Sequence, residues 1–301
     1  MILKSILARL FQGYRTGTFP TKSGPKLPPD FKGRPVLAAD MTEADLKVAA
    51  AACPCPGCLA LRDGKPSLDL GRCTFCGRCA AASSKITFTK EYRLAVFKRE
   101  DLIVSAGDPE YVPPQNPNAA IPRLLKRSCQ IREVSAAGCA ACELDFNVLG
   151  TLAWDLGRFG LKVVASPRHA DAVYVTGPVS KNMALALQKT YAAMSEPRFV
   201  IAAGACAISG GLYAGSPEVR NGTSDVVPEP DLFIPGCPPH PATALEGLLR
   251  SGDMLSDRAA GECRYYVTDS TEGFAEAEAG DVISFGKYEQ DNDSTDGEED
   301  I

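Results

Sequence analysis

Twelve cysteines constrain this chain of 301 residues more than any other feature of its sequence. A first block, residues 53–79, holds six of them, and a second block, residues 139–237, holds four. The first block contains a C-x2-C-x2-C run that begins at Cys73, preceded by a Cys-Pro pair at Cys53. A C-x2-C-x2-C run with a distant Cys-Pro is typical of [4Fe–4S] ligation. The spacing therefore predicts a chain that folds around two iron–sulfur sites and conducts electrons.

Composition places these cysteines in a globular chain. With 45% hydrophobic and 23% charged residues, the sequence has room for two modest domains and extensions. No apolar stretch is long enough to span a bilayer, and Met1–Phe11 lacks the features of a signal peptide. We therefore expect a cytoplasmic chain, in which clustered cysteines serve as metal ligands more often than as disulfides.

The net charge of −5 is unevenly distributed. Residues 289–300 carry seven acidic residues and no basic ones, so the remainder has 30 acidic and 32 basic residues. The first 36 residues hold seven Lys or Arg and one acid, Asp30. Such basic charge favours nucleic acid or an anionic membrane surface. Because the chain shows no nucleic-acid motif, we expect no nucleic-acid binding and favour a membrane or a partner subunit.

The two ends are predicted to be extensions. Apolar residues recur at helical spacing in residues 1–11, which predicts an amphipathic helix that packs on its own domain or lies at a membrane interface. A Pro/Gly/Lys-rich arm follows, so that residues 1–37 form one segment. Residues 253–301 are expected to be an acidic, largely disordered tail. That tail either docks a partner or, as we favour, only keeps the carboxyl-terminal end of the chain solvated.

The interior divides into two predicted domains. Residues 38–107 form a small domain with the first cysteine block and strands at Lys85–Lys90 and Arg93–Lys98, and a proline-rich linker, 108–125, follows. In residues 126–252 apolar strands alternate with helices, which predicts a mostly parallel sheet covered on both faces. The expected strands are Ile131–Ala136, Lys162–Ser166, Ala172–Gly177, Arg198–Ala203 and Leu232–Pro235, and the expected helices are Glu143–Phe159, Lys181–Met194 and Ala242–Arg250.

The second block falls at the ends of these strands. Cys139 and Cys142 follow the first strand, Cys206 follows the fourth, and Cys237 follows the last. Parallel strands present their carboxyl ends at one edge, where open α/β sheets bind ligands, so the four thiols are expected to converge there. Nearby glycines would let the backbone approach a bulky cluster. A structural zinc is the disfavoured alternative, because zinc sites usually use close local pairs.

Several motifs in this region resemble one family. They are Gly138-Cys139-Ala-Ala-Cys142-Glu143, Ser166-Pro167-Arg168-His169-Ala170-Asp171, Val175-Thr176-Gly177-Pro178, Gly204-Ala-Cys206-Ala-Ile-Ser-Gly210-Gly211 and Pro235-Gly236-Cys237-Pro238-Pro239. The match over residues 126–252 is similar to the small subunit of membrane-bound [NiFe] hydrogenases such as formate hydrogenlyase, and to the homologous 20 kDa subunit of complex I. The resemblance implies a flavodoxin-like α/β domain. It also implies that Cys139, Cys142, Cys206 and Cys237 bind the [4Fe–4S] cluster nearest the large subunit's active site.

The first block resembles the polyferredoxin-like subunit of the same complexes, related to the 23 kDa subunit of complex I, in Leu70-Gly71-Arg72-Cys73-Thr-Phe-Cys76-Gly-Arg-Cys79. The resemblance implies a small α+β ferredoxin-like domain before the flavodoxin-like one. Relatives carry two C-x2-C-x2-C-x3-C-P motifs, whose fourth cysteine binds the other cluster.

The chain departs from that pattern in a consistent way. Met41–Ala52 holds no cysteine, and Ser83-Ser84 stands where Cys-Pro would be, so one cluster's complete ligand set is missing. The remaining set, Cys53, Cys73, Cys76 and Cys79, would hold a single [4Fe–4S] cluster. Cys55 or Cys58 is an alternative fourth ligand, and a zinc site in this block is a further alternative.

Other sequence features narrow the function. No G-x-G-x-x-G follows a strand and no phosphate-binding G-x4-G-K-[ST] occurs, so we expect no nucleotide binding. Two histidines do not support a hydrolytic triad. The chain also lacks the paired C-x-x-C motifs that hold nickel in large subunits, so it is not expected to be the hydrogen-activating subunit.

These observations lead to an expected function. The chain would be an oxidoreductase subunit that relays electrons through two [4Fe–4S] clusters to or from a large catalytic subunit, [NiFe] hydrogenase-like or complex I 49 kDa-like. Other redox and membrane subunits would be partners, and the complex would lie on the inner face of the cytoplasmic membrane. A quinone-reducing complex I-like module is the alternative, and a sensory or assembly protein is a third.

A few chemistry-bearing residues have structural interpretations. Cys129 and Cys263 lack ligand spacing and are expected to be small buried side chains. His240 is interpreted as a helix-start or surface residue, and His169 as a packing residue or part of an interface with the large subunit. Glu143 could serve a proton path, although a carboxylate at a helix N-terminus is already favoured electrostatically.

Overall fold

A computed structural model describes Lys4, Leu7–Ala8, Phe19 and residues 25–117 and 128–252. All of them belong to one unit of the chain, Met1–Glu262. The predicted amphipathic helix lies largely outside the described residues, and the predicted acidic tail, residues 253–301, lies entirely outside them. No helix among the described residues is long and apolar enough to cross a membrane.

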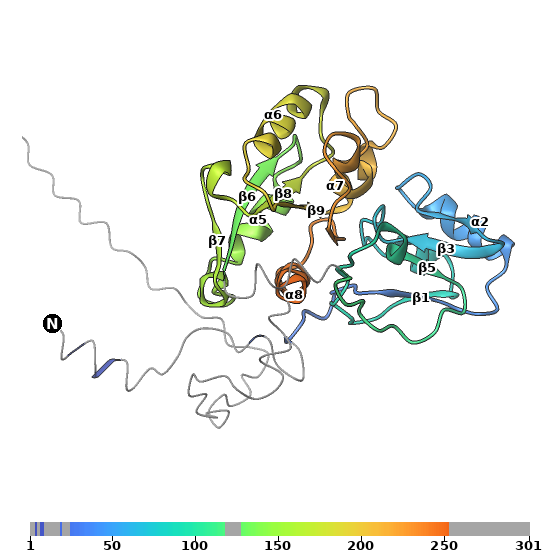
Figure 1. Cartoon of the computed structure of the whole chain (residues 1–301). Helices are drawn as coiled ribbons and strands as arrows, with labels where there is room; N and C mark the ends of the chain where they lie inside the picture. Colours follow the sequence, from blue (N-terminus) through green and yellow to red (C-terminus); the bar gives the residue numbers. More distant parts are fainter. Residues whose placement is uncertain (1–3, 5–6, 9–18, 20–24, 118–127, 253–301) are drawn as a thin grey trace, which may run out of the picture. The chain divides into compact units, whose positions relative to one another are not determined.

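A five-stranded parallel sheet organises residues 128–252 (Figure 1). Its strand order is β10-β9-β8-β6-β7, which in chain order is the flavodoxin-like arrangement 2-1-3-4-5. All five predicted strands are confirmed, as β6 Cys129–Ser135, β7 Leu161–Val163, β8 Ala172–Thr176, β9 Phe199–Ala203 and β10 Leu232–Ile234. The strand order reverses between β6 and β8, and this is where such sheets bind ligands.

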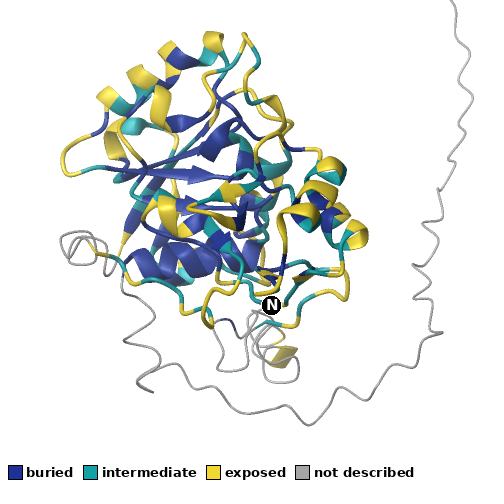
Figure 2. Cartoon of the chain, turned by 90° about the vertical axis from the view of Figure 1, so that its right-hand side faces the viewer, coloured by how far each residue is buried: buried dark blue, intermediate teal, exposed yellow. Residues whose placement is uncertain are grey.

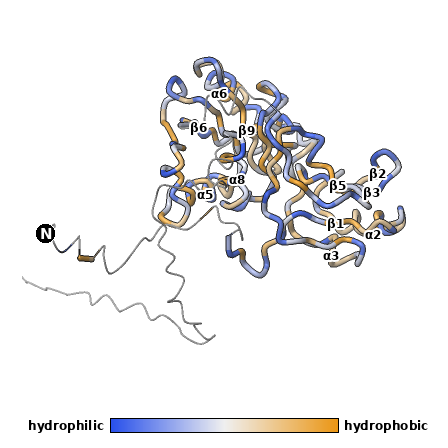
Figure 3. Tube along the Cα trace, turned by 60° about the horizontal axis from the view of Figure 1, so that its bottom comes forward, coloured by the Kyte–Doolittle hydropathy of each residue, from blue (hydrophilic) through white to orange (hydrophobic). Residues whose placement is uncertain are grey.

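Helices cover both faces of the sheet. Tyr174 of β8 faces a core that contains Phe146 of α5 (Ala141–Val148) and Leu245 of α8 (Pro241–Ser251). Its neighbour Val175 faces the opposite core, with Leu187 of α6 (Lys181–Ala192). Strands β8, β9 and β10 are buried along their whole length. The strands at the centre of the molecule are dark blue in Figure 2, the colour of buried residues. Helix α6 alternates hydrophobic and hydrophilic residues, as expected of a helix with one exposed face (Figure 3).

One predicted helix is shorter than expected. We predicted a helix over Glu143–Phe159, but α5 ends at Val148 and the chain then turns through Gly150. After the turn, the Leu156 N–H donates to the Leu149 carbonyl at 2.8 Å, and a short 3-10 helix, η2 (Leu156–Phe159), follows. Apolar residues continue at helical spacing across the turn, which explains the overestimate.

Residues 25–117 form a separate set of small elements. Two sheets are present, one pairing β1 with β4 and one ordered β2-β3-β5, and all their pairings are antiparallel. This part contains both helices and strands, and its ferredoxin-like fold stays a prediction. The sequence analysis missed its longest helix, α2. The elements are β1 Pro35–Leu37, α2 Glu43–Ala52, β2 Leu59–Arg62, β3 Lys65–Asp69, α3 Arg78–Ala82, β4 Ile86–Phe88, η1 Arg99–Leu102 and β5 Ile103–Ser105.

Residues 25–117 and 128–252 share a hydrophobic core. Leu70 and Val96 lie in the same buried cluster as Ile208 and Phe233. The predicted strand Arg93–Lys98 is wrong, because that segment pairs only at Val96, which forms an isolated antiparallel bridge with Phe233. The domain boundaries at 107 and 126 stay predictions.

Four short helices complete the described part of the sheet domain besides η2. They lie in the loops that connect the strands. They are η3 Pro167–His169, α7 Ala205–Ser209, η4 Gly211–Tyr213 and η5 Thr223–Asp225.

Candidate metal centres

The loop from β6 to α5 carries the first two cysteines of the second block. Cys139 is exposed, and Cys142 lies in the first turn of α5 with its side chain half-buried. Ala137 and Ala140 have φ angles of 69° and 67°, a left-handed conformation that strains any residue with a Cβ. Such strain clusters at functional sites and persists only where the surroundings fix it. The strained backbone at Ala137 and Ala140 is therefore consistent with a functional role for this loop.

The loops after β9 and β10 are bonded to one another and bring Cys206 and Cys237 to the same edge. The Gly204 N–H donates to the Ile234 carbonyl at 2.8 Å, and the Ala205 N–H donates to the Gly236 carbonyl at 2.9 Å. Cys206 then lies in α7, while Cys237 is exposed beyond β10.

Gly204 lies against a thiol at this edge. Its φ is +88°, and a Cβ at this position would lie 2.7 Å from the Cys142 Sγ. Only glycine leaves room for the sulfur there. The loop after β9 thus contacts a cysteine of the loop after β6, and the predicted convergence of the two loops is observed.

The thiols of this edge lie within electrostatic range of one another. Burial raises the pKa of Cys142, and Glu143, Cys206 and Cys237 raise it further. Burial, followed by Cys237 and Cys139, raises the pKa of Cys206 to about 11. Thiolates gathered in this way repel one another, whereas coordination to a cation deprotonates a thiol outright. The donor set therefore fits a positively charged metal centre.

A pair of carboxylates lies beneath this edge. Glu143 Oε1 accepts hydrogen bonds from the hydroxyls of Ser135 at 2.6 Å and Thr176 at 2.7 Å. Burial raises the pKa of Glu143, but these two bonds outweigh it and hold the pKa below its usual value. Glu133, on the same strand as Ser135, has a buried Oε1 with no hydrogen-bond partner. Burial, followed by repulsion from Glu143, raises the pKa of Glu133 to about 7.

The first block is built from loops. Cys53 caps the C-terminus of α2, Cys73 is buried before α3, Cys76 is exposed, and Cys79 is buried within α3. Burial raises the pKa of Cys79, and Cys53 and Cys76 are the charged neighbours that raise it further. Three of the four predicted ligands are therefore brought together.

Cys58 connects the remaining predicted ligand to this group. The Cys53 thiol lowers the pKa of Cys58, but the Cys73 thiol and burial outweigh it and raise that pKa. Cys53 and Cys55 likewise act on the pKa of each other. Cys58 is buried, and its Sγ lies 3.5 Å from the Asp69 carbonyl oxygen. The fourth ligand thus stays open among three cysteines, with Cys53 as the prediction.

The two cysteine blocks lie near each other. Cys55 contributes to raising the pKa of Cys206 and of Cys237, and Cys76 also contributes at Cys237, in each case after burial. A cavity of about 220 Å³ is lined by Gly236 and Pro238, which flank Cys237, and by Phe75 beside Cys76. The sequence did not indicate this proximity, because it depends on packing between residues far apart in the chain.

Among the described residues, no three His, Cys, Asp or Glu side chains are arranged around a single metal ion. Each group of four cysteines does supply the donor set of a [4Fe–4S] cluster, in which each thiolate binds a different iron. The residues present fit that cofactor in both blocks, by donor chemistry and by the space left at Gly204.

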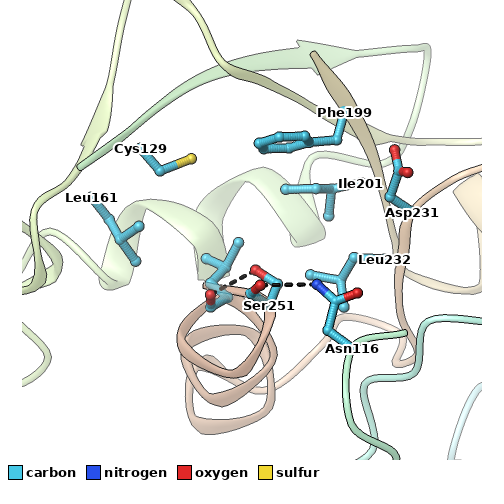
Figure 4. A pocket seen from close by; sticks show the side chains of 9 residues that line it. Asn116, Cys129, Leu161, Phe199, Ile201, Asp231, Leu232 and Ser251 are labelled. Carbon is cyan, nitrogen blue, oxygen red and sulfur yellow. Dashed lines mark hydrogen bonds between the residues drawn. The ribbon is translucent and has the colours of Figure 1, made fainter. Parts of the chain in front are cut away.

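Cys129 lies apart from both groups, as expected. Its sulfur points into a small apolar pocket beside Leu161 and Phe199 (Figure 4). Burial raises the pKa of Cys129 to about 12. At the rim of the pocket, the Asn116 amide donates to the Ser251 carbonyl at 2.9 Å. Cys263 lies outside the described residues.

Of the two histidines, His240 lies where the sequence analysis placed it, while His169 is exposed rather than packed and its interface role stays a prediction. His240 precedes α8 and its Nδ1 accepts the Ala242 N–H at 3.1 Å, so it is a helix-start residue. Burial lowers the pKa of His240. His169 ends η3 and is exposed.

Sequence reasoning missed a buried ionic group beside the first block. Asp69, at the end of β3, contacts the guanidinium groups of Arg62, Arg72 and Arg99. In the sequence, Asp69 lies between Arg62 and Arg72 and close to Cys73. That pattern does not resemble a set of metal ligands, so the sequence analysis did not identify it.

Comparison with known proteins places the second block in a family. Residues 139–251 match the family described as "NADH ubiquinone oxidoreductase, 20 Kd subunit". A subunit of the NADH-quinone oxidoreductase of Desulfovibrio desulfuricans is 43% identical over 40% of this chain and 64% of its own length. Formate hydrogenlyase subunit 7 of Escherichia coli is 36% identical over 46% of this chain and 54% of its own length. The chain thus spans about half to two thirds of these relatives.

A third relative is covered more completely. The protein named "Probable membrane-bound hydrogenase subunit mbhJ" of Pyrococcus furiosus is 34% identical over 48% of this chain and 86% of its own length. The family match contains strands β7 to β10 and the four cysteines of the second block, Cys139, Cys142, Cys206 and Cys237. On this evidence the chain belongs to the NADH ubiquinone oxidoreductase 20 Kd subunit family, which includes hydrogenase subunits.

Proposed function

We propose that this chain is an electron-transfer subunit of a membrane-associated hydrogenase complex, similar to formate hydrogenlyase, with two [4Fe–4S] clusters. The observation that carries the proposal is the proximity of the two cysteine blocks: one cavity is lined by Phe75, which adjoins Cys76, and by Gly236 and Pro238, which flank Cys237. Relatives named as subunits of hydrogenase and NADH-quinone oxidoreductase support a redox role.

Cys139, Cys142, Cys206 and Cys237 would hold one cluster. The second would be held by Cys53, Cys73, Cys76 and Cys79. A bound [4Fe–4S] cluster takes up and releases an electron at a potential set by its charge, hydrogen bonds and exposure. The protein supplies the thiols, keeps the edge free of side-chain bulk at Gly204, and holds the Glu143 carboxylate through hydrogen bonds from Ser135 and Thr176.

The partner would be a large catalytic subunit of the [NiFe] hydrogenase type, with other redox and membrane subunits. The Cys139-x-x-Cys142-Glu143 spacing supports the hydrogenase type. The exposed thiols of Cys139 and Cys237 lie at the edge where the cluster would approach that subunit. The basic amino-terminal segment supports a peripheral position on the inner face of the cytoplasmic membrane.

A quinone-reducing complex I-like module is the second candidate. It is favoured by the 43% identity to an NADH-quinone oxidoreductase subunit, higher than the 36% identity to formate hydrogenlyase subunit 7. Purification of the native complex separates the two. Nickel and hydrogen-dependent dye reduction in the purified complex support the hydrogenase type, and inhibitor-sensitive quinone reduction without nickel supports the alternative.

The clusters are tested by anaerobic iron and sulfide analysis with potentiometric EPR on the full chain. We expect about eight irons and two separable signals, with Cys206→Ala losing one signal and Cys76→Ala the other. Cys129→Ala is the matched control, since it removes a buried thiol outside both groups and should retain all the iron. About four irons in the wild type, or zinc in the first block, would contradict the two-cluster proposal.

Three single variants determine which of Cys53, Cys55 and Cys58 is the fourth ligand of the first-block cluster. We expect Cys53→Ala to lose the signal that Cys76→Ala loses, while Cys55→Ala and Cys58→Ala retain it. Loss of that signal in Cys58→Ala alone would assign the ligand to Cys58, whose pKa is raised by the neighbouring Cys73.

A further inference from the structure

The ionic group at Asp69 lies between the two cysteine blocks and has more positive than negative charge. The Asp69 side chain is 1% exposed. Its Oδ2 lies 2.6 Å from a guanidinium nitrogen of Arg99, 3.4 Å from one of Arg62 and 3.6 Å from one of Arg72. Among the described residues, no other carboxylate pairs with these three arginines, so the group carries a formal charge of +2.

One side of this group is bonded to the loop that contains the first cysteine block. The Asp69 N–H donates to the Cys58 carbonyl at 2.8 Å, and the Cys58 thiol lies 3.5 Å from the Asp69 carbonyl. Arg72 directly precedes Cys73, and its guanidinium donates to the Pro56 carbonyl at 3.3 Å. The positive charge is thus fixed between Cys58 and Cys73.

The other side reaches the helix that carries Cys206. The Asp69 Oδ1 accepts the Gly71 N–H at 2.8 Å, and the Gly71 carbonyl accepts the Ser209 hydroxyl at 2.8 Å. A Cβ at Gly71 would lie 2.7 Å from a methyl group of Ile208 and 2.9 Å from the guanidinium carbon of Arg99. Arg99, Gly71 and α7 are therefore in direct contact.

Resting on the proposed function, we infer that Asp69, Arg62, Arg72 and Arg99 form a potential-setting group that raises the reduction potential of the first-block cluster. Reduction adds a negative charge, which nearby fixed positive charge stabilises, and a partly buried group is screened less than a surface one. Because Asp69 neutralises only one of three arginines, the group favours the reduced cluster. These four side chains would not bind iron, so they would act on the cluster only through their electrostatic charge.

The test is a potentiometric EPR titration of the full chain, purified anaerobically, with variants of opposite charge effect. Arg72→Gln should move the midpoint of the first-block signal to more negative potential, and Asp69→Asn should move it to more positive potential. We expect on the order of a tenfold change in the reduced-to-oxidised ratio for Arg72→Gln, which is 59 mV for a one-electron couple. Arg72→Lys keeps the charge and should restore most of the wild-type value.

Lys189→Gln is the matched charge control. Lys189 is exposed in the last turn of α6, which runs toward the amino ends of the strands and away from the cysteine edge. Lys189→Gln should leave the midpoint potentials of both EPR signals unchanged. Denaturant unfolding of each variant measures stability separately from the potential, so a structural effect is distinguished from a charge effect.

The outcomes are distinguishable from failure of the proposed function. Absence of the first-block signal in the wild type contradicts the proposed function, whereas a signal whose midpoint is unchanged in Arg72→Gln overturns only the inference. Midpoints that move in the same direction in Arg72→Gln and Asp69→Asn would also overturn it. If Asp69→Asn does not fold, Arg62→Gln replaces it and should give a smaller negative shift than Arg72→Gln, and no shift overturns the inference.

Discussion

The two cysteine groups are built in different ways. At the sheet edge, Cys142, Cys206 and Cys237 come from three separate loops, each held at the end of a buried parallel strand. In the first block, Cys53, Cys55 and Cys58 lie within residues 53–58, and the Cys53 thiol lies 3.7 Å from the Cys55 carbonyl oxygen. The sheet fixes the first arrangement through its core, while the second depends on local bonds to α2 and Asp69.

This difference indicates where each group is vulnerable. A sheet-edge site tolerates changes in the surrounding surface, but not in the glycine where two loops meet. A loop site depends on the caps and buried bonds that hold its turns. Four substitution experiments test this comparison, and they follow in order from the largest expected effect to the smallest.

The largest effect is expected at the meeting of two loops in the sheet edge. Gly204→Ala places a Cβ within van der Waals overlap of the Cys142 sulfur, at 2.7 Å. We expect loss of about half the iron and of the signal that Cys206→Ala removes. Gly64→Ala is the control, because Gly64 has a similar positive φ of +75° with no atom within 4 Å of its Cβ. Full iron content in Gly204→Ala would contradict the proposed proximity.

A smaller effect is expected where the two parts of the chain are bonded together. Ser209→Ala removes the buried hydroxyl that donates to the Gly71 carbonyl at 2.8 Å. The unfolding free energy should fall by about 1–3 kcal/mol, since a buried acceptor loses its partner. Denaturant titration measures the loss, and the exposed Ser224→Ala should change stability by less than about 0.5 kcal/mol. Equal midpoints for the two variants would show that the bond is not important.

Capping of α2 tests the dependence of the first block on local structure. Thr42 and Asp45 form a reciprocal capping box at the start of α2, which ends at Cys53. Thr42→Ala should cost about 1 kcal/mol and weaken iron retention in the first block. Ser180→Ala removes the matching cap of α6 and should cost a similar amount without loss of iron. Iron loss in both variants would remove the distinction between the two groups.

The smallest effect concerns pH. Burial raises the pKa of Glu133 from its ordinary 4.5 to about 7, so folding favours the protonated carboxyl. Its contribution to stability is therefore fully present below about pH 4.5 and is lost as the pH rises toward 7. Relative to wild type, Glu133→Gln should lose this part of the pH dependence in unfolding measurements between pH 4.5 and 7. If the unfolding free energy of Glu133→Gln depends on pH as that of wild type does, the Glu133 carboxyl is solvated and its pKa is not raised.

Much of the sheet was predictable from the sequence, because apolar strands leave a strong pattern. All five strands and the helices α6 and α8 were expected within a few residues. The extension of α5 beyond Val148 was wrong, since Gly150 ends the helix while Trp154 keeps the apolar spacing. Helix α2 was missed although Thr42 and Asp45 supply a capping signal.

The candidate site was predictable only where strand ends determine it. Convergence of Cys139, Cys142, Cys206 and Cys237 followed from placing each after a parallel strand. The approach of Cys55 to Cys237 was not predictable, since it results from packing of Leu70 and Ile208 in a shared core. No sequence period encodes such a contact.

The bridge between Val96 and Phe233 has a consequence for solubility. Phe233 belongs to β10, the outer strand of the parallel sheet, and it both donates to and accepts from the Val96 backbone, at 2.8 and 2.9 Å. Unpaired outer strands recruit other chains into intermolecular sheets. Residues 128–252 expressed without the preceding segment would expose these groups and should aggregate, so the amino-terminal part also protects the sheet from self-association.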